Sequence, residues 1–265
     1  MNGTRPLALV TGASSGIGFE LAKQFAENGF DLVLAAEDLG LGIAADEVRA
    51  HGADVHVVRT DLTAPDGVER LLGAVAATGR PVAAAALNAG VGQGGAFLDT
   101  DLADELRVID LNITSTVRLA KGLLPDMVAR GEGKLLFMSS VAATVPGSFQ
   151  AVYNASKSFV QSFAQALRNE LEDTGVTVTS VMPGPTETHF FHRAGMEDTR
   201  IGRQRKDDPE QVARQGFEAL MAGRKKAVAG SVKTKAQAVV SRVVPDSVKA
   251  AAHRKAAEPG SGEGK

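Results

Sequence analysis

The chain contains one tyrosine, Tyr153, and a lysine, Lys157, follows it four residues later in a segment with helical spacing, Gln150 to Leu171. Residues at positions i and i+4 share one face of a helix. A phenol with an ordinary pKa of about 10 is a poor acid or base at neutral pH, but a nearby ammonium group stabilises its anion and lowers that pKa. The pair predicts a general acid and base that exchanges a proton with a carbonyl or alcohol oxygen as hydride is transferred at carbon. The same spacing is common among surface pairs, so the prediction needs support from the rest of the chain.

Two serines, Ser139 and Ser140, come directly after the apolar run Leu135 to Met138. In parallel sheets the strands end at the crevice where ligands bind. We therefore expect Ser140 to hold the substrate oxygen. Ser139 is expected to make a turn or cap hydrogen bond.

A glycine-rich segment, TGASSGIG from Thr11 to Gly18, joins the apolar run Leu7 to Val10 to a stretch of helical spacing, Ile17 to Asn28. Glycines allow a tight turn and close approach to a ligand, and the N–H groups of the following helix attract negative charge. The segment predicts a loop that binds the pyrophosphate of a dinucleotide. A strand-to-helix turn without a ligand is the alternative for an isolated loop of this kind.

An acidic pair, Glu37 and Asp38, follows the apolar run Leu32 to Ala36, about where dinucleotide-binding folds place a ribose-binding carboxylate. Either carboxylate could accept a hydrogen bond from a ribose 2′-hydroxyl and would repel a 2′-phosphate. No lysine or arginine stands at Ser14, Ser15, Ala36 or Glu37 to attract that phosphate. NAD(H) is thus favoured over NADP(H), and both stay open. The alternative is that both carboxylates are solvated loop charges.

The elements that must position these residues alternate along the chain. Short apolar runs are typical of strands buried on both faces, and longer stretches between them have helical spacing, so we expect an α/β fold with a parallel sheet covered on both sides. The remaining predicted strands are Val55 to Val58, Val82 to Leu87 and Val176 to Met182, and further predicted helices are Ala44 to His51, Gly67 to Thr78 and Asp101 to Val128.

The domain organisation follows from the same pattern. We expect one catalytic domain over residues 1–230, because no linker interrupts residues 5–230. Two amphipathic helices, Lys233 to Val244 and Asp246 to Ala257, are split by Pro245 and form a predicted extension, residues 231–257, packed on the domain or on a partner subunit. Residues 258–265 are expected to be a disordered tail.

Composition excludes several classes of protein. The 265 residues include no cysteine, which rules out disulfides, Cys-ligated zinc, iron–sulfur clusters and thiol nucleophiles. A net charge of -2 argues against nucleic acid as a partner. No export signal and no membrane-spanning run is visible, so we expect a cytoplasmic protein. His189 and His192 lack a third ligand in register, so no metal site is expected.

Together these segments resemble the short-chain dehydrogenase/reductase family in its single-domain form, over about residues 5 to 230. Thr11 to Gly18 is similar to the cofactor loop of that family, Asn88-Ala89-Gly90 to its NAG motif and Tyr153 to Lys157 to its YxxxK. Ser140 lies thirteen residues before Tyr153, the usual family spacing, and Asn112 lies in the preceding helix. Pro183-Gly184 with Thr188 resembles the PGxxxT motif. Six features in the family's order make the resemblance specific.

The resemblance implies a Rossmann-like doubly wound sheet of about seven parallel strands in the order 3-2-1-4-5-6-7. It implies that Tyr153 is the acid and base and that Lys157 binds the nicotinamide ribose. Ser140 would orient the substrate oxygen, and Asn112 would hold a water that relays protons. The implied cofactor-binding residues are Gly12, Ser14, Ser15, Gly16, Ile17, Gly18, Glu37, Asp61, Leu62, Asn88, Ala89, Gly90, Tyr153, Lys157, Pro183, Gly184, Thr186 and Thr188.

The implied activity is reversible hydride transfer between a nicotinamide cofactor and an alcohol or carbonyl compound. Small ketones, steroids and 3-oxoacyl groups all stay open as substrates. A homodimer or homotetramer is implied, packed through the predicted helices Asp101 to Val128 and Gln150 to Leu171. The sequence departs from the family at Ala36, where the ribose-binding aspartate is usual, and Glu37 follows it.

Two other readings of the chain are open. A catalytically silent dinucleotide-binding regulator of the same fold is the alternative to the enzyme, because fold alone does not determine function. A sugar epimerase or dehydratase is disfavoured by the spacing of the glycine loop.

The segment after Thr188 carries two further expectations. The resemblance places the start of a substrate lid here, with Phe190, Phe191 and Met196 as an apolar pocket wall or as plain packing. The charged residues that follow are expected to form a solvated loop. They are Arg203, Arg205, Lys206, Asp207 and Asp208.

Overall fold

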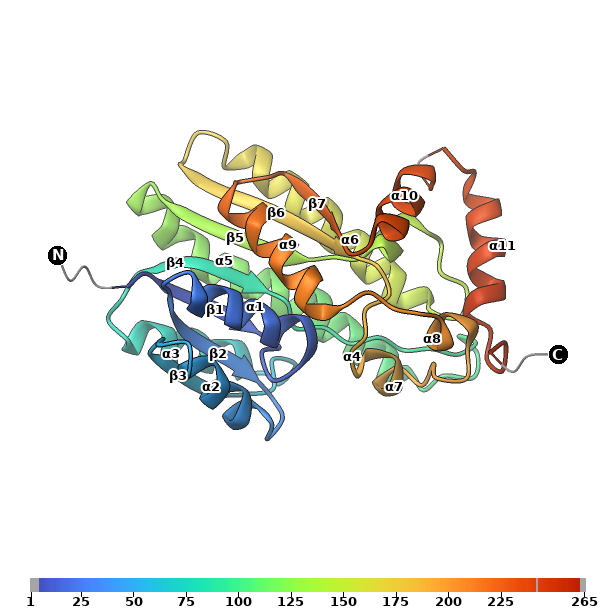
Figure 1. The fold of residues 1–265 in the computed structure, drawn as a ribbon, viewed down its shortest axis with the longest axis horizontal. Helices are drawn as coiled ribbons and strands as arrows, with labels where there is room; N and C mark the ends of the chain where they lie inside the picture. The colour runs from blue at the N-terminus through green and yellow to red at the C-terminus, as the bar shows by residue number, and fades with distance from the viewer. Residues whose placement is uncertain (1–4, 242, 263–265) are drawn as a thin grey trace.

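A computed structural model of the chain describes residues 5–241 and 243–262. Its centre is a sheet of parallel strands in the order β3-β2-β1-β4-β5-β6-β7, which confirms the expected topology (Figure 1). Leu9 lies opposite Val33 on one side and Ala85 on the other, so β1 is central. The strands are β1 Leu7–Thr11, β2 Asp31–Ala36, β3 Val55–Arg59, β4 Val82–Leu87, β5 Gly133–Met138, β6 Val176–Pro183 and β7 Lys226–Ala229.

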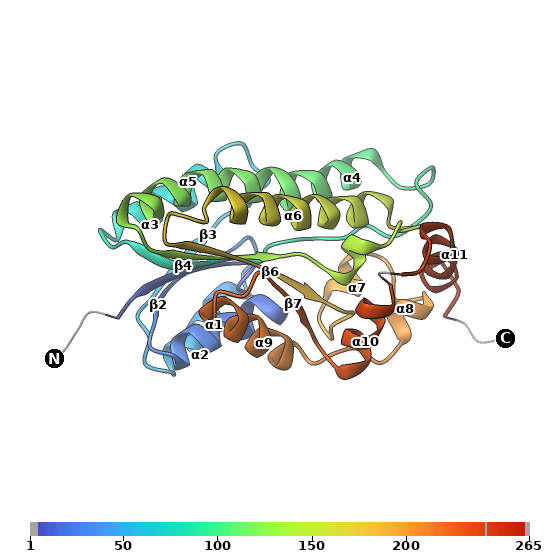
Figure 2. The same ribbon diagram turned by 90° about the horizontal axis from the view of Figure 1, so that it is seen from above.

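Helices cover both faces of the sheet, as Figure 2 shows. One face carries α1 Gly16–Glu27, α2 Leu41–Arg49 and α9 Pro209–Met221. The other carries α3 Gly67–Ala77, α4 Leu102–Ile109, α5 Ser115–Arg130 and α6 Ala151–Glu170. The central strands are rich in Leu, Val and Ala and are buried on both faces, as a doubly covered parallel sheet requires.

Each layer has its own apolar core. On the α1 side, the ring of Phe25 packs edge-on against Phe30 at 5.2 Å and against Phe217 at 5.1 Å, which joins α1 to α9. Edge-to-face aromatic pairs of this kind add stability beyond their buried area. On the α5 side, Leu119 and Met127 are buried against the opposite face of the sheet.

The seventh strand, β7, has no apolar run that predicts it. Its four residues begin with Lys226, and only three of them are apolar. The strand pairs along one side with β6, where Val181 lies opposite Ala227. A short edge strand of this kind gives a weak periodic signal, so the resemblance predicted it and the spacing did not.

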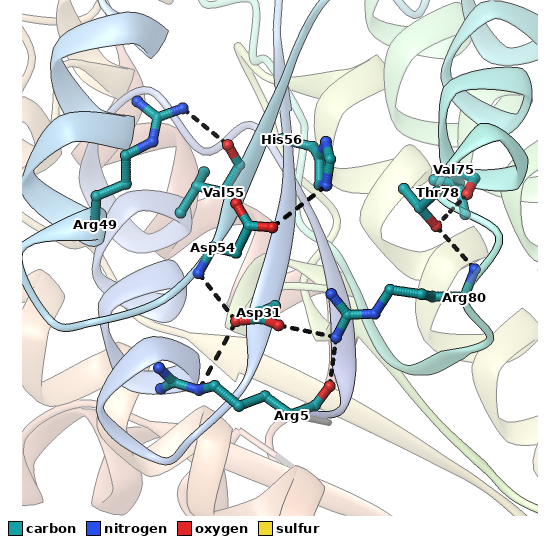
Figure 3. A network of polar contacts seen from close by, with 9 residues as sticks. All are labelled: Arg5, Asp31, Arg49, Asp54, Val55, His56, Val75, Thr78 and Arg80. Carbon is teal, nitrogen blue, oxygen red and sulfur yellow. Dashed lines mark hydrogen bonds and ion pairs between the residues drawn. The ribbon is translucent and has the colours of Figure 1, made fainter. Parts of the chain in front are cut away.

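A polar network joins the amino ends of β1 to β4, on the side of the sheet away from the strand ends that carry the predicted site (Figure 3). The buried carboxylate of Asp31 pairs with Arg80 at 2.9 Å and with Arg5 at 3.8 Å, and it accepts a hydrogen bond from the N–H of Asp54 at 2.9 Å. Arg80 also donates to the carbonyl of Arg5. The network ties these strand starts together with charges that are partly shielded from water.

The C-terminal residues fold back over the carboxyl ends of the strands (Figures 1 and 2). Two helices, α10 Val232–Val240 and α11 Asp246–Ala257, lie beside the short helices α7 Phe190–Arg193 and α8 Arg200–Arg203. No helix in residues 5–241 or 243–262 has both the length and the hydropathy to cross a bilayer.

The segment after α11 was expected to be loose, and its described part has defined contacts. The N–H of Gly260 donates to the Asp198 carboxylate at 2.7 Å, and the N–H of Gly262 donates to the Asp198 carbonyl at 2.8 Å. The last residues of the predicted tail, 263–265, lie outside the described residues, as do 1–4 of the predicted domain.

Candidate active site

The candidate site is a cavity of about 360 Å³ at the carboxyl ends of the strands. Ligands of open α/β sheets bind at this edge. All of the predicted site residues except Asn112 line this one cavity. They are Gly12, Ser14, Ser15, Gly16, Ile17, Gly18, Glu37, Asp61, Leu62, Asn88, Ala89, Gly90, Ser140, Tyr153, Lys157, Pro183, Gly184, Thr186 and Thr188.

The glycine loop turns from β1 into α1 with a backbone that only glycine adopts easily. Gly12 and Gly16 have φ angles of 65° and 56°, in the left-handed region. A Cβ on Gly18 would overlap the carbonyl oxygen of Gly12, so this helix position needs glycine for close packing. Within the described chain, the N-cap residue Ser15 makes no side-chain capping bond, which leaves N–H groups of the first helical turn directed at the cavity.

The segment after β4 braces this loop. The hydroxyl oxygen of Thr11 accepts hydrogen bonds from the N–H groups of Asn88 at 3.0 Å and Ala89 at 3.1 Å. The amide of Asn88 donates to the carbonyls of Thr11 at 3.0 Å and Gly12 at 3.3 Å. These bonds hold the ends of β1 and β4 together directly beneath the glycine turn.

The tyrosine and lysine lie one turn apart on α6, and both are buried. The ammonium nitrogen of Lys157 is 5.8 Å from the centre of the Tyr153 ring and donates to the carbonyl of Met138 at 3.0 Å. Burial raises the pKa of Tyr153 to about 12, although a hydrogen bond with Ser140 acts in the opposite direction. Burial also lowers the pKa of Lys157 to about 8.

These pKa directions differ from the sequence expectation, in which the lysine charge lowers the pKa of the phenol. The reason is that both groups leave water together, and desolvation penalises the charged form of each. In the protein alone, Tyr153 is protonated at neutral pH.

The two serines after β5 have different partners. Ser139 donates from its hydroxyl to the carbonyl of Lys157 at 3.1 Å, so the expected turn or cap hydrogen bond is wrong: the partner lies within α6, eighteen residues away. Ser140 begins the short 3-10 helix Val141–Thr144 and accepts from the N–H of Ala142 at 3.1 Å. Its hydroxyl also bonds with Tyr153, so it lies at the reacting phenol.

Asn112 lies behind the cavity wall. It belongs to a single π-helical turn, Asp110–Thr114, between α4 and α5, and π-turns occur frequently at functional sites. Its amide nitrogen donates to the carbonyl of Val91 and the hydroxyl of Ser156, both at 2.9 Å, and its oxygen accepts from the N–H of Val91 at 2.9 Å. Both amide hydrogens therefore bind protein atoms, which joins the segment after β4 to α6.

Gly90 separates Asn112 from the lysine. A Cβ at this position would lie 3.0 Å from the side-chain oxygen of Asn112 and 3.1 Å from the nitrogen of Lys157. A side chain here would crowd both groups, so Gly90 leaves space for the ammonium group of Lys157.

The acidic residues after β2 and β3 face an arginine that the sequence analysis missed. Arg107 of α4 pairs with Glu37 at 2.7 Å and with Asp61 at 3.7 Å. Partial burial would raise the pKa of Asp61, but hydrogen bonds from Thr63 and the charge of Arg107 together hold it below its usual value. Seventy residues separate Arg107 from Glu37, and no local spacing predicts the contact.

Asp38 has a different partner from Glu37. Its carboxylate accepts from the hydroxyl of Ser14 at 2.5 Å and from the N–H of Gly40 at 2.9 Å. This carboxylate therefore links the glycine loop to the segment after β2, and it is not simply a solvated charge.

Of the predicted lid residues, two line the cavity and one is buried in an apolar cluster. Phe190 and Phe191 line the cavity, and the Phe190 ring lies 5.1 Å from the Tyr153 ring. Met196 is fully buried and packs with Phe191 and Ala257 of α11.

The expectation of a solvated loop over residues 203–208 is wrong for Lys206 and Asp207, while Asp208 is exposed. Asp207 is 9% exposed, and its carboxylate accepts from the hydroxyl of Thr234 at 2.6 Å and the N–H of Ser231 at 3.1 Å. Asp208 caps α9. Lys206 lies 5.2 Å from the Phe191 ring centre. The loop is ordered because the C-terminal helices, which no local pattern relates to it, pack against it.

Histidines do not gather with other potential metal ligands. In residues 5–241 and 243–262, no group of three or more His, Cys, Asp or Glu side chains could hold a metal ion. His192 pairs instead with Glu197 at 2.9 Å.

Comparison with known proteins agrees with this geometry. The sequence model described as short chain dehydrogenase matches residues 6–198, from β1 to beyond β6. The uncharacterized oxidoreductase YmfI of Bacillus subtilis (strain 168) is 29% identical over 189 residues, which cover 70% of this chain and 77% of that protein.

Two solved structures extend the likeness to the whole sheet. A short-chain dehydrogenase from Sphingobium yanoikuyae in complex with NADPH has a TM-score of 0.80 and 30% identity, over 89% of this chain and 93% of its own. A short chain dehydrogenase/reductase from Burkholderia phymatum in complex with NAD has a TM-score of 0.80 and 27% identity, over 90% and 92%.

Gly18→Ala should destabilise the protein, because its Cβ overlaps the backbone of Gly12 and the loop must shift. We expect a loss of about 1–3 kcal/mol in the free energy of unfolding, measured by urea denaturation. Gly42→Ala is the matched control: it lies in α2 with nothing within 4 Å of the added Cβ, so it should be neutral or stabilising. Equal effects of the two substitutions would contradict this account of the loop.

Proposed function

The chain belongs to the short chain dehydrogenase family, and from this membership we propose that it is an NAD(P)-dependent oxidoreductase that interconverts an alcohol and a ketone or aldehyde. The observation that carries the proposal is that Tyr153, Ser140 and Lys157 line the same cavity as the glycine loop. A proton donor and a dinucleotide loop that open into one cavity support reaction of a bound carbonyl compound beside a cofactor.

The residues at the glycine loop fit a nicotinamide dinucleotide. Gly12, Gly16 and Gly18 leave backbone space for a pyrophosphate, and the first turn of α1 offers N–H groups and a positive dipole end. The two similar solved proteins bind NADPH and NAD. When bound, such a cofactor gives a hydride to the carbonyl carbon or takes one from the alcohol.

The chain's own residues would handle the proton and the substrate oxygen. Tyr153 is protonated at neutral pH, so in the reducing direction it gives its proton to the carbonyl oxygen. Ser140, which is hydrogen-bonded to the phenol, holds that oxygen in place. Lys157 places a positive charge beside the phenolate that remains. The implied water-holding role of Asn112 would fall to its backbone carbonyl, because both side-chain amide hydrogens bind protein atoms.

Glu37 favours NAD(H) over NADP(H). The carboxylate of Glu37 lines the adenosine end of the cavity and would repel the 2′-phosphate of NADP(H). Arg107 weakens that argument, because its guanidinium already neutralises Glu37 at 2.7 Å. We therefore propose that the preference for NAD(H) is set by the balance of this ion pair rather than by Glu37 alone.

The surface supports a homodimer or homotetramer through the layer of α4, α5 and α6. Exposed apolar side chains on this layer include Leu102, at 66%, Leu106 and Phe159. Such side chains gain free energy when a second copy covers them. We also propose that residues 1–230 are the catalytic domain and that 231–257 extend it.

Tyr153→Phe should abolish turnover while leaving cofactor binding intact, because it removes only the phenolic proton donor. We expect kcat on a ketone found by panel screening to fall roughly 10²- to 10⁴-fold. The Kd for NADH, measured by nicotinamide fluorescence, should stay within about threefold. Gln165→Ala, at an exposed position on the same helix, is the control and should retain activity. Full turnover by Tyr153→Phe would refute the proposed mechanism.

The two reaction directions should respond oppositely to pH. Reduction needs the protonated phenol, which the raised pKa of Tyr153 maintains through neutral pH, so its rate should hold there and fall only in alkali. Oxidation needs the phenolate, so kcat/KM for the alcohol should rise by up to about tenfold per pH unit. The measurement is kcat/KM in both directions at saturating cofactor. An oxidation rate that falls as pH rises would contradict Tyr153 as the base.

Substitutions in the Glu37–Arg107 pair should move cofactor preference in opposite directions. Glu37→Ala removes the repulsion and frees Arg107 for a 2′-phosphate, so NADPH affinity should rise about tenfold, equal to roughly 1.4 kcal/mol. Arg107→Ala leaves Glu37 unopposed, so NADPH affinity should fall by a similar factor with NADH little changed. Fluorescence titration of both variants and the double variant measures this. If NADPH affinity moves in neither variant, the ion pair does not control preference.

A further inference from the structure

The C-terminal helices form part of the wall around the substrate end of the cavity. Three residues of α10, Ser241 directly after it and one residue of α11 line the cavity, and all of this extension lies beyond the residues matched by the family model. The lining residues are Thr234, Gln237, Ala238, Ser241 and His253. The chain's own C-terminus thus contributes to the space in front of Tyr153.

Helix α11 is fastened to the segment that leads into Tyr153. The ammonium group of Lys249 donates to the carbonyl of Thr144 at 2.9 Å, and Arg254 lies 5.6 Å from the centre of the Phe149 ring. The Nδ1 atom of His253 lies 3.0 Å from the carbonyl of Ser148, so Nδ1 carries the hydrogen and donates it. Burial lowers the pKa of His253, so the other ring nitrogen, Nε2, carries a lone pair and can accept a hydrogen bond but not donate one.

Arg193 lines the same end of the cavity from α7. Phe190 precedes Arg193 by three residues in the same helix, and the Phe190 ring lies 5.1 Å from the Tyr153 ring.

Neighbouring carboxylates have other partners. Glu197 pairs with His192 at 2.9 Å, and Glu187 pairs with Lys206 at 3.4 Å. Among the described residues, Arg193 has no ion pair.

The charges that line the cavity are divided between its two ends. Its carboxylates are Glu37, Asp38 and Asp61, and all three follow β2 or β3 at the adenosine end. No Asp or Glu of the described chain lines the end formed by α7 and α11. An anionic group would therefore find the guanidinium of Arg193 there without a competing carboxylate.

We propose that the substrate is a carbonyl compound that carries a carboxylate, or another group of single negative charge, bound by the guanidinium of Arg193. A guanidinium presents two parallel N–H groups that match a carboxylate, and this geometry favours carboxylates over neutral esters. The proposal rests on the proposed carbonyl chemistry at Tyr153.

The test compares oxo acids of increasing length with their methyl esters, which keep the carbonyl and lose the charge. Wild-type protein should show kcat/KM at least tenfold higher for one acid than for its ester, mainly through KM. Arg193→Ala should remove this preference, and Arg193→Lys should restore part of it. His192→Ala is the matched control, since its side chain is 72% exposed and pairs with Glu197; it should behave as wild type.

A binding measurement separates this proposal from the proposed function. Aliphatic carboxylates are titrated into the Tyr153→Phe protein with NADH bound, and their competition is followed by nicotinamide fluorescence. Binding that is lost in the additional Arg193→Ala variant supports the anion site even if no carbonyl compound is turned over. Equal binding of acids and esters would overturn the proposal, and so would binding of an acyl thioester of coenzyme A without binding of any free acid.

Discussion

The bracing of the glycine turn by Thr11 and Asn88 is the contact on which the site depends. Strands β1 and β4 are neighbours in the sheet, yet the chain leaves them toward opposite faces, and this reversal opens the cleft. Four hydrogen bonds between Thr11, Gly12, Asn88 and Ala89 hold the two strand ends at that point. Because α1 starts directly from this turn, its N–H groups face the cavity only while the bracing holds.

The second constraint is the burial of Tyr153 and Lys157. A buried ammonium is costly unless a partner compensates it, and the carbonyl of Met138 supplies a dipole rather than a full charge. Burial therefore lowers the pKa of Lys157 to about 8, because the carbonyl compensates only part of the cost of burying the charge. Two residues leave space for the ammonium group of Lys157. Asn112 joins the segment after β4 to α6 by hydrogen bonds, and Gly90 has no side chain that would contact the lysine nitrogen. No carboxylate among the described residues pairs with Lys157, so its charge stays close to the phenol.

The sequence was most informative where local chemistry decides the structure. Buried strands such as Leu32 to Ala36 need continuous apolar residues, and Gly12 needs a left-handed backbone, so both leave a readable pattern. Arg107 and Asp207 leave none, because each acts on residues far away in the chain. The raised pKa of Tyr153 was missed for a related reason. The i, i+4 spacing predicts which groups are adjacent but not how completely the surrounding helices remove water from them.

Asp207 connects the two ends of the cleft through hydrogen bonds of its backbone and of its side chain. Its backbone bonds with Pro185 and Glu187, in the segment that contains Thr186, one of the predicted cofactor-binding residues. Its carboxylate binds the start of α10, the first helix of the wall at the substrate end. These donors satisfy the oxygens of a buried carboxylate. The position of the C-terminal wall and that of the segment after β6 are therefore fixed by the same residue, although no single stretch of sequence contains both.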